Sequence, residues 1–166
     1  YIYSTSNKFN NWSFIAGEGI IDLHSTKLLL NNIPELQISD AYLIPKDGNL
    51  SINEGFLIDP LINSELILDT LSEFYKFINA NITIESKNKF EGKGIFEYIN
   101  FNEDTFKIPF SEFELRRSGE SNNTNRFTTF SSGLVDKASP ILMEPGFNFF
   151  DNIELFANNE QLLFNG

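Results

Sequence analysis

Gly92 and Gly94 form a G-x-G pair in the stretch KFEGKGIFEY, which could bind a phosphate or could only bend a strand. A dinucleotide-binding loop needs a third glycine three residues further on and a helix after it. Glu97 occupies that third position, and the residues around it alternate in the manner of a strand. We therefore interpret the two glycines as a β-bulge or a close approach between strands.

Trp12 is the only tryptophan, and it lies near two tyrosines and an asparagine at the start of the chain. An aromatic face stacks on the apolar face of a pyranose, while amide groups bind its hydroxyls. This combination predicts a ligand-binding platform made of Trp12, Tyr1, Tyr3 and Asn11. The competing interpretation is that Trp12 packs against a sheet.

Oxygen-bearing side chains stand at every second position in the segment that follows Pro45. Asp47, Asn49 and Asn53 are candidate ligands for a structural calcium ion, because Ca²⁺ prefers carboxylate and amide oxygens. The segment departs from a calcium loop at its sixth position, which is Ile52 and not glycine. We expect no cofactor, and a bound calcium ion is the alternative.

Few residues in the sequence are candidates for catalysis. His24 is the only histidine and there is no cysteine, so thiol catalysis and zinc-thiolate sites are excluded. Carboxylate pairs such as Glu112 with Glu114, or Asp40 with Asp59, could serve a glycosidase, but chance pairs are expected among 23 acidic residues. We expect no catalytic residue and no enzyme, and a hydrolase is the least favoured interpretation.

The charge of the chain limits its partners. Twelve Lys and Arg against 23 Asp and Glu give a net charge of −11, which repels nucleic acids and anionic membranes. At 166 residues, with 41% hydrophobic residues, the chain is long and apolar enough to bury a core. We expect it to contact neighbouring domains of a parent protein or another envelope protein, with a glycan as the alternative partner.

Short alternating runs separated by Asn-rich turns predict an all-β fold. Residues 14–23 and 90–99 share an aromatic, a G-x-G and an apolar run, and a weaker copy occupies 149–155, which indicates a repeated hairpin. A small residue also recurs at Ala41, Ser64 and Ala80, where a coiling chain would turn tightly. We therefore predict an irregular parallel β-solenoid with hairpin units, with a β-sandwich or jelly roll as the alternative.

Three regions are expected along the chain. Residues 1–115 form the β-repeat region, residues 116–133 form an exposed loop rich in Ser and Asn, and residues 134–166 form a terminal β-hairpin on the same core. The start at Tyr1 is neither a signal peptide nor a Met, which suggests a piece of a longer protein.

Several segments carry a resemblance to a known group of proteins. The runs 45–52, 78–84 and 90–98, with Ile108-Pro109-Phe110, look like segments of very large envelope or secreted proteins of Bacteroidota. In those proteins an aromatic-x-G-x-G-x-Y-x-Y unit leads to a strand ending in Phe-Asp-Gly, to which the end of this chain, Leu-Phe-Asn-Gly, is similar. This chain departs from the unit at Ile95 and Glu97. The resemblance implies repetitive β architecture and a periplasmic, outer-membrane-associated or extracellular location.

These observations predict a non-catalytic structural or protein-interaction segment of a larger cell-envelope or secreted protein. The alternative is a carbohydrate-binding module built on Trp12 and its neighbouring aromatic residues.

Overall fold

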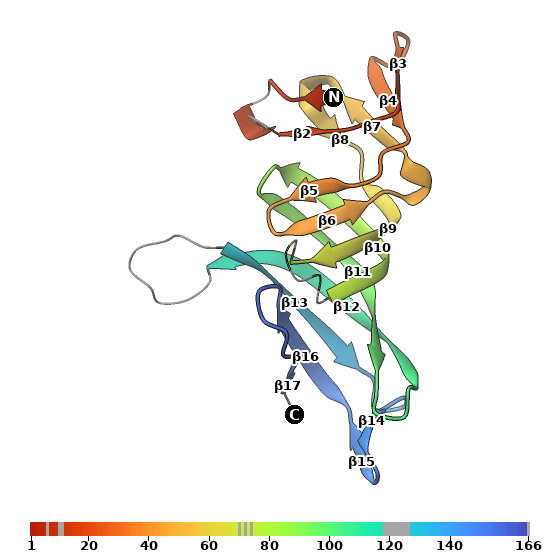
Figure 1. The fold of residues 1–166 in the computed structure, drawn as a ribbon, viewed down its shortest axis with the longest axis vertical. Coiled ribbons are helices and arrows are strands. Elements are labelled where there is room, and N and C mark those ends of the chain that lie inside the picture. Colours follow the sequence, from red (N-terminus) through yellow and green to blue (C-terminus); the bar gives the residue numbers. More distant parts are fainter. Residues whose placement is uncertain are drawn as a thin grey trace.

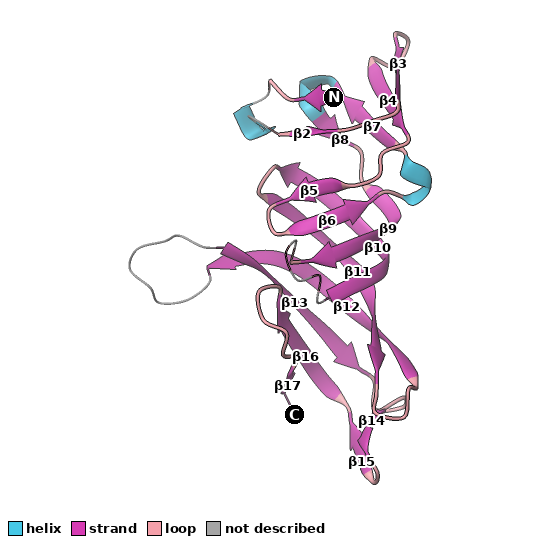
Figure 2. Cartoon of the chain, in the orientation of Figure 1, coloured by secondary structure: helices cyan, strands magenta, loops and turns pink. Residues whose placement is uncertain are grey.

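The protein is all-β. A computed structural model describes residues 1–5, 7–9, 12–69, 71, 73, 75–117 and 127–165. Within these ranges the helical elements are 3₁₀ turns of three residues, and none is long or apolar enough to cross a membrane. Strands dominate the remainder (Figure 2). Their bounds are β1 Ile2–Tyr3, β2 Ser13–Phe14, β3 Glu18–Asp22, β4 Lys27–Asn31, β5 Leu36–Ile38, β6 Ala41–Ile44, β7 Leu50–Asn53, β8 Leu57–Ile58, β9 Leu61–Leu68, β10 Tyr75–Ser86, β11 Lys89–Ile99, β12 Thr105–Arg117, β13 Phe127–Val135, β14 Ile141–Glu144, β15 Phe147–Phe149, β16 Asp151–Phe156 and β17 Leu163–Asn165.

One nine-stranded sheet holds most of the strand residues, in the order β17-β16-β13-β12-β11-β10-β9-β6-β5. Its strands follow one another along the chain almost as they do across the sheet, so most neighbours are joined by short turns. A four-stranded sheet, β3-β4-β7-β8, lies at one end of an elongated molecule, and the hairpin β14-β15 lies at the other end (Figure 1).

The predicted parallel solenoid is wrong. Every pairing found in the described residues is antiparallel. Tight turns between consecutive strands impose this direction, because a parallel pair needs a long crossover connection. The all-β class itself is confirmed.

The recurring small residues belong to bulges and not to the corners of a coil. Asn63 and Asn79 have positive φ angles of 55° and 49° inside β9 and β10, and the pairing register between the strands shifts on both sides of Ala80. Ser64 and Ala80 follow these residues and face each other across the two strands. Bulges bend a strand and increase its twist, so this pair lies where the sheet curls.

The three proposed hairpin copies each begin with a strand that has an antiparallel partner further along the chain, in β3–β4, β11–β12 and β16–β17. The three first strands differ in length, with 5, 11 and 6 residues. They lie in different sheets or at different sheet positions, so they do not stack on one another as rungs.

The boundaries predicted for the Ser/Asn-rich loop were too wide. Arg116 and Arg117 end β12, and residues 127–133 belong to β13, where Thr129 and Ser131 are fully buried. β-branched and aromatic residues at 127–130 favour a strand in spite of the polar composition. Residues 118–126 lie outside the described residues. The region 134–166 contains two hairpins, β14–β15 and β16–β17, and the second extends the large sheet.

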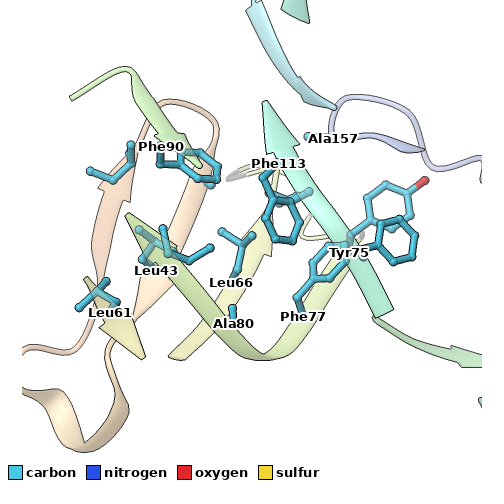
Figure 3. Close-up of a cluster of buried hydrophobic side chains, with 14 of the residues drawn as sticks. Leu43, Leu61, Leu66, Tyr75, Phe77, Ala80, Phe90, Phe113 and Ala157 are labelled. Carbon is cyan, nitrogen blue, oxygen red and sulfur yellow. The ribbon is translucent and has the colours of Figure 1, made fainter. Parts of the chain in front are cut away.

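The core of the large sheet is aromatic. The Phe77 ring contacts those of Phe96, Phe110 and Phe113 with centroids 4.9–5.5 Å apart. Figure 3 shows Phe113 among Leu66, Tyr75 and Phe77, with Ala80 close by. The contacts with Phe110 and Phe113 are edge-to-face, and such contacts add stability beyond the area that they bury.

Both glycines of the G-x-G pair serve close packing, as the sequence predicted. A Cβ on Gly94 would lie 3.3 Å from the Phe77 Cβ and 3.5 Å from the Phe113 ring. A Cβ on Gly92 would lie 2.3 Å from the backbone oxygen of Asn81, which follows the bulge in β10. Neither glycine opens a helix or a phosphate loop.

Candidate functional site: the cleft between β11 and β12

The pairing between β11 and β12 covers only part of each strand. It runs from Ile99↔Thr105 to Gly94↔Phe110 and then stops. Beyond that point residues 89–93 pair only with β10, and residues 112–117 pair only with β13. Figure 1 shows the ends of β12 and β13 turning away from the β10–β11 hairpin. The large sheet therefore splits between two of its central strands.

A groove of about 1210 Å³ lies at this split. Its walls are the diverging segments 89–93 of β11 and 111–115 of β12, and β10 contributes Asn81 and Thr83. Phe90 and Phe113 are buried, and both line the groove, with ring centroids 6.5 Å apart. The groove is thus a polar-rimmed cleft with an aromatic floor.

The diverging segments present backbone groups that the sheet does not use. In a strand, alternate residues direct their N–H and C=O groups to opposite neighbours. Half of these groups in 89–93 and in 111–117 therefore point into the cleft. No strand of the described residues pairs with either segment on that side, so each segment is an open edge inside the sheet.

A bulge in β12 is the local cause of the split. The register between β12 and β13 shifts between Phe110 and Glu112, at the residue where pairing with β11 ends. Gly133 lies opposite Phe110, and a Cβ there would come within 2.5 Å of the Phe110 ring. The ring covers the glycine, which lets the bent strand stay close to β13.

The two faces of the open β12 edge differ in chemistry. Phe113 is buried in the core and Leu115 is half-buried on the same face, where their partners in β13 are Ser131 and Thr129. Glu112 and Glu114 lie on the opposite, exposed face. Glu114 pairs with Arg116, whereas Glu112 accepts a hydrogen bond from the Ser132 hydroxyl at 3.1 Å and makes no ion pair among the described residues.

The electrostatic potential in the groove is negative. Five carboxylates and two ammonium groups line it: Asp40, Asp69, Glu91, Glu112 and Glu114, with Lys89 and Lys93. Lys89 is bound by Glu85 at 2.6 Å, and this contact raises the pKa of Lys89. Within the described part of the chain neither Glu91 nor Glu112 forms a salt bridge, although the charge of Glu91 contributes to the raised pKa of Lys89. Because carboxylates outnumber ammonium groups, the groove favours positively charged ligands.

The predicted carbohydrate platform is not formed by Trp12. Its side chain is only 6% exposed, it packs on Phe14 and Phe56, and its indole N–H donates to the backbone oxygen of Gln37 at 2.8 Å. A buried indole has no free face for a sugar. Tyr1 and Tyr3 are 89% and 72% exposed on β1, and Asn11 lies outside the described residues.

The three predicted calcium ligands lie along a turn and the strand that follows it. Asp47 lies in a 3₁₀ turn, whereas Asn53 lies at the far end of β7. Because the chain between Asn49 and Asn53 is an extended strand, these two residues are about 13 Å apart. Calcium ligands must converge to roughly 2.5 Å from one ion. The Asn53 amide instead donates to Asp59 at 2.6 Å. No group of three acidic or histidine side chains converges elsewhere in the described residues.

Asp59 takes part in an ion pair and not in a carboxylate pair. Lys27 and Asn53 donate to its two oxygens at 2.8 and 2.6 Å, and these contacts hold the pKa of Asp59 below its usual value. Asp40 lies in the turn between β5 and β6 and is bound by Thr129. His24 stands in the exposed turn between β3 and β4, so it does not line the groove.

The sequence named several groove residues without bringing them together. Gly92, Glu112 and Glu114 were singled out, but their common location depends on where the β11–β12 pairing stops. One signal was available. The 90–99 and 105–117 segments are unusually long for strands, and long strands with an internal glycine or proline are prone to bulges and splits.

No protein-family model matches the chain, and no curated protein or solved structure is significantly similar to it.

Proposed function

We propose that the protein is a non-catalytic protein-binding module and that it binds its partner in the cleft between β11 and β12. The observation that carries this proposal is the pair of open strand edges inside the large sheet. Unpaired strand edges bind peptide backbones through the hydrogen bonds that hold a sheet together.

The surroundings of the cleft support the same proposal. A hydrophobic floor with a polar rim is the usual anatomy of a peptide-binding groove. Two of the carboxylates that line the cleft make structural contacts: Asp40 accepts hydrogen bonds from Thr129, and Glu114 pairs with Arg116. Burial of Trp12 removes the main support for the glycan alternative.

The wider setting of the module is part of the proposal. From the resemblance of its segments, we place it in a large cell-envelope or secreted protein, where its partner is a neighbouring domain or another envelope protein. The curled antiparallel sheet corresponds to the sandwich or jelly-roll alternative more closely than to a solenoid.

A peptide-display selection tests the proposal. A library of random twelve-residue peptides is selected against the intact chain, and binders are measured by fluorescence anisotropy. Ser111→Trp places a bulky ring in the groove, and Thr105→Trp places the same ring at the paired, exposed start of the same strand. We expect Ser111→Trp to weaken binding about tenfold or more and Thr105→Trp to leave it unchanged.

Circular dichroism and thermal melts establish that both variants fold. Peptides that bind the two variants equally well, or a selection that yields no binder, would contradict the proposal.

A further inference from the structure

The cleft also carries information about the shape and charge of its occupant, and this inference rests on the proposed function. We propose that the occupant is an extended peptide of alternating apolar and cationic residues, which adds as an antiparallel strand to the open edge of β12.

Length and charge select β12 over β11. The β12 edge is open over residues 111–117 and the β11 edge over 89–93, so β12 offers the longer template, of about 20 Å. Because β11 and β12 are antiparallel to each other, one inserted strand can be antiparallel to only one of them. Antiparallel pairing is the more stable kind. Lys89 and Lys93 lie on the β11 side, where they repel a cation.

The residues of β12 dictate the side chains of the added strand. A new strand places its side chains beside those of its neighbour on each face, and such cross-strand pairs stabilise a sheet. On the inner face the neighbours are Phe113 and Leu115, which favour apolar residues. On the outer face the neighbours are Glu112 and Glu114. Glu114 is already paired with Arg116, so Glu112, which forms no salt bridge in the described residues, is the group that favours Lys or Arg.

Other occupants fit this cleft less well. A second copy of the chain carries a net charge of −11 and would be repelled by the acidic rim. Self-pairing of the exposed edge strand β3 about Ile20 is opposed by charge, because the antiparallel register would set Glu18 against Asp22. A polyanion such as a nucleic acid meets the same repulsion.

The test uses synthetic seven-residue peptides. The first alternates valine and lysine, and the second alternates valine and glutamate; both are labelled and measured by fluorescence anisotropy at low ionic strength. We expect the lysine peptide to bind and the glutamate peptide to bind at least about tenfold more weakly. Equal binding of the two peptides would overturn the charge assignment.

Backbone methylation tests the strand geometry. A peptide on a single open edge donates from only alternate N–H groups, so methylating one alternate set should weaken binding about tenfold per lost hydrogen bond, and methylating the other set should be tolerated. Equal sensitivity of both sets, or of neither, would overturn the addition of one strand to one edge.

Charge reversal locates the contact. Glu112→Lys should weaken binding of the lysine peptide about tenfold, whereas Glu144→Lys, which changes the net charge equally on the exposed β14, should change it little. Equal effects of the two variants would show attraction by net charge alone and overturn the site. Displayed peptides that depend on the cleft but are not cationic would overturn this inference and leave the proposed function standing.

Discussion

The carboxylate of Asp40 accepts two hydrogen bonds from Thr129, one from the backbone N–H at 2.8 Å and one from the hydroxyl at 2.5 Å. Asp40 lies in the turn between β5 and β6, at one edge of the large sheet, and Thr129 lies in β13, near the other. The contact therefore spans the curled sheet, and it does so through a side chain where no backbone pairing joins these strands.

Removal of this contact should destabilise the fold. Asp40→Ala leaves the buried N–H of Thr129 without its acceptor, which should cost about 1–3 kcal/mol of the free energy of unfolding. Asp40→Asn keeps one acceptor oxygen and should cost less. Urea denaturation measures both, with Asp47→Asn in an exposed turn as the control. An Asp40→Ala variant as stable as that control would show that the contact contributes nothing.

Gly92 should tolerate no side chain. A Cβ at this position would lie 2.3 Å from the backbone oxygen of Asn81, and the backbone has to move to relieve that clash. Gly92→Ala should cost about 2–4 kcal/mol or prevent folding. Gly55→Ala meets no atom within 4 Å and should cost only about 1 kcal/mol, from its positive φ. Similar thermal melts for the two variants would refute the close approach.

Two buried serines should respond in opposite ways. The Ser131 hydroxyl donates to the backbone oxygen of Glu112 at 2.6 Å, so Ser131→Ala should cost about 1 kcal/mol. The buried Ser64 hydroxyl has no hydrogen-bond partner in the described residues, so Ser64→Ala should be neutral or slightly stabilising. Chemical denaturation of both variants compares them directly. A marked loss of stability in Ser64→Ala would indicate a bound water or another partner.

Tyr75 should make the fold sensitive to alkali. Burial raises its pKa to about 12, from 10.0, and the hydroxyl donates to the backbone oxygen of Asn159. The unfolded chain therefore loses this proton first as the pH rises. The stability that Tyr75 contributes is complete below about pH 10 and is lost between about pH 10 and about pH 12, by roughly 2–3 kcal/mol.

Tyr75→Phe removes this group, and it should lower stability at about pH 8 by about 1 kcal/mol while flattening the alkaline decline. The measurement is the free energy of unfolding by urea at several pH values, with the exposed Tyr3→Phe as the control. Parallel declines for the wild type and Tyr75→Phe would contradict the assignment.

Local patterns in the sequence predicted the strands and the role of the glycines, because both depend on neighbouring residues. Alternation at 106–110 and 113–115 gives β12, and G-x-G at Gly92 and Gly94 gives a close approach. The small residues Ser64 and Ala80 were recognised as marking bends. The direction of the neighbouring strands was not recognised, because a bulge and a solenoid corner both require a small side chain.

The candidate site was harder to predict. Trp12 looks the same in sequence whether it is buried on Phe14 or exposed to a sugar, since only the fold decides its environment. The cleft is defined by the absence of pairing beyond Gly94↔Phe110, and pairing is a relation between segments. Residue spacing within one segment therefore does not reveal which segments pair.

The near-sequential strand order also has a consequence for how the chain folds. Each strand from β9 to β12 pairs with the next strand along the chain, so these ladders close short loops and can form early. The contact between Asp40 and Thr129 joins residues 89 positions apart and can form only after those ladders are in place. Substitution of Asp40 should therefore accelerate unfolding and leave the folding rate nearly unchanged.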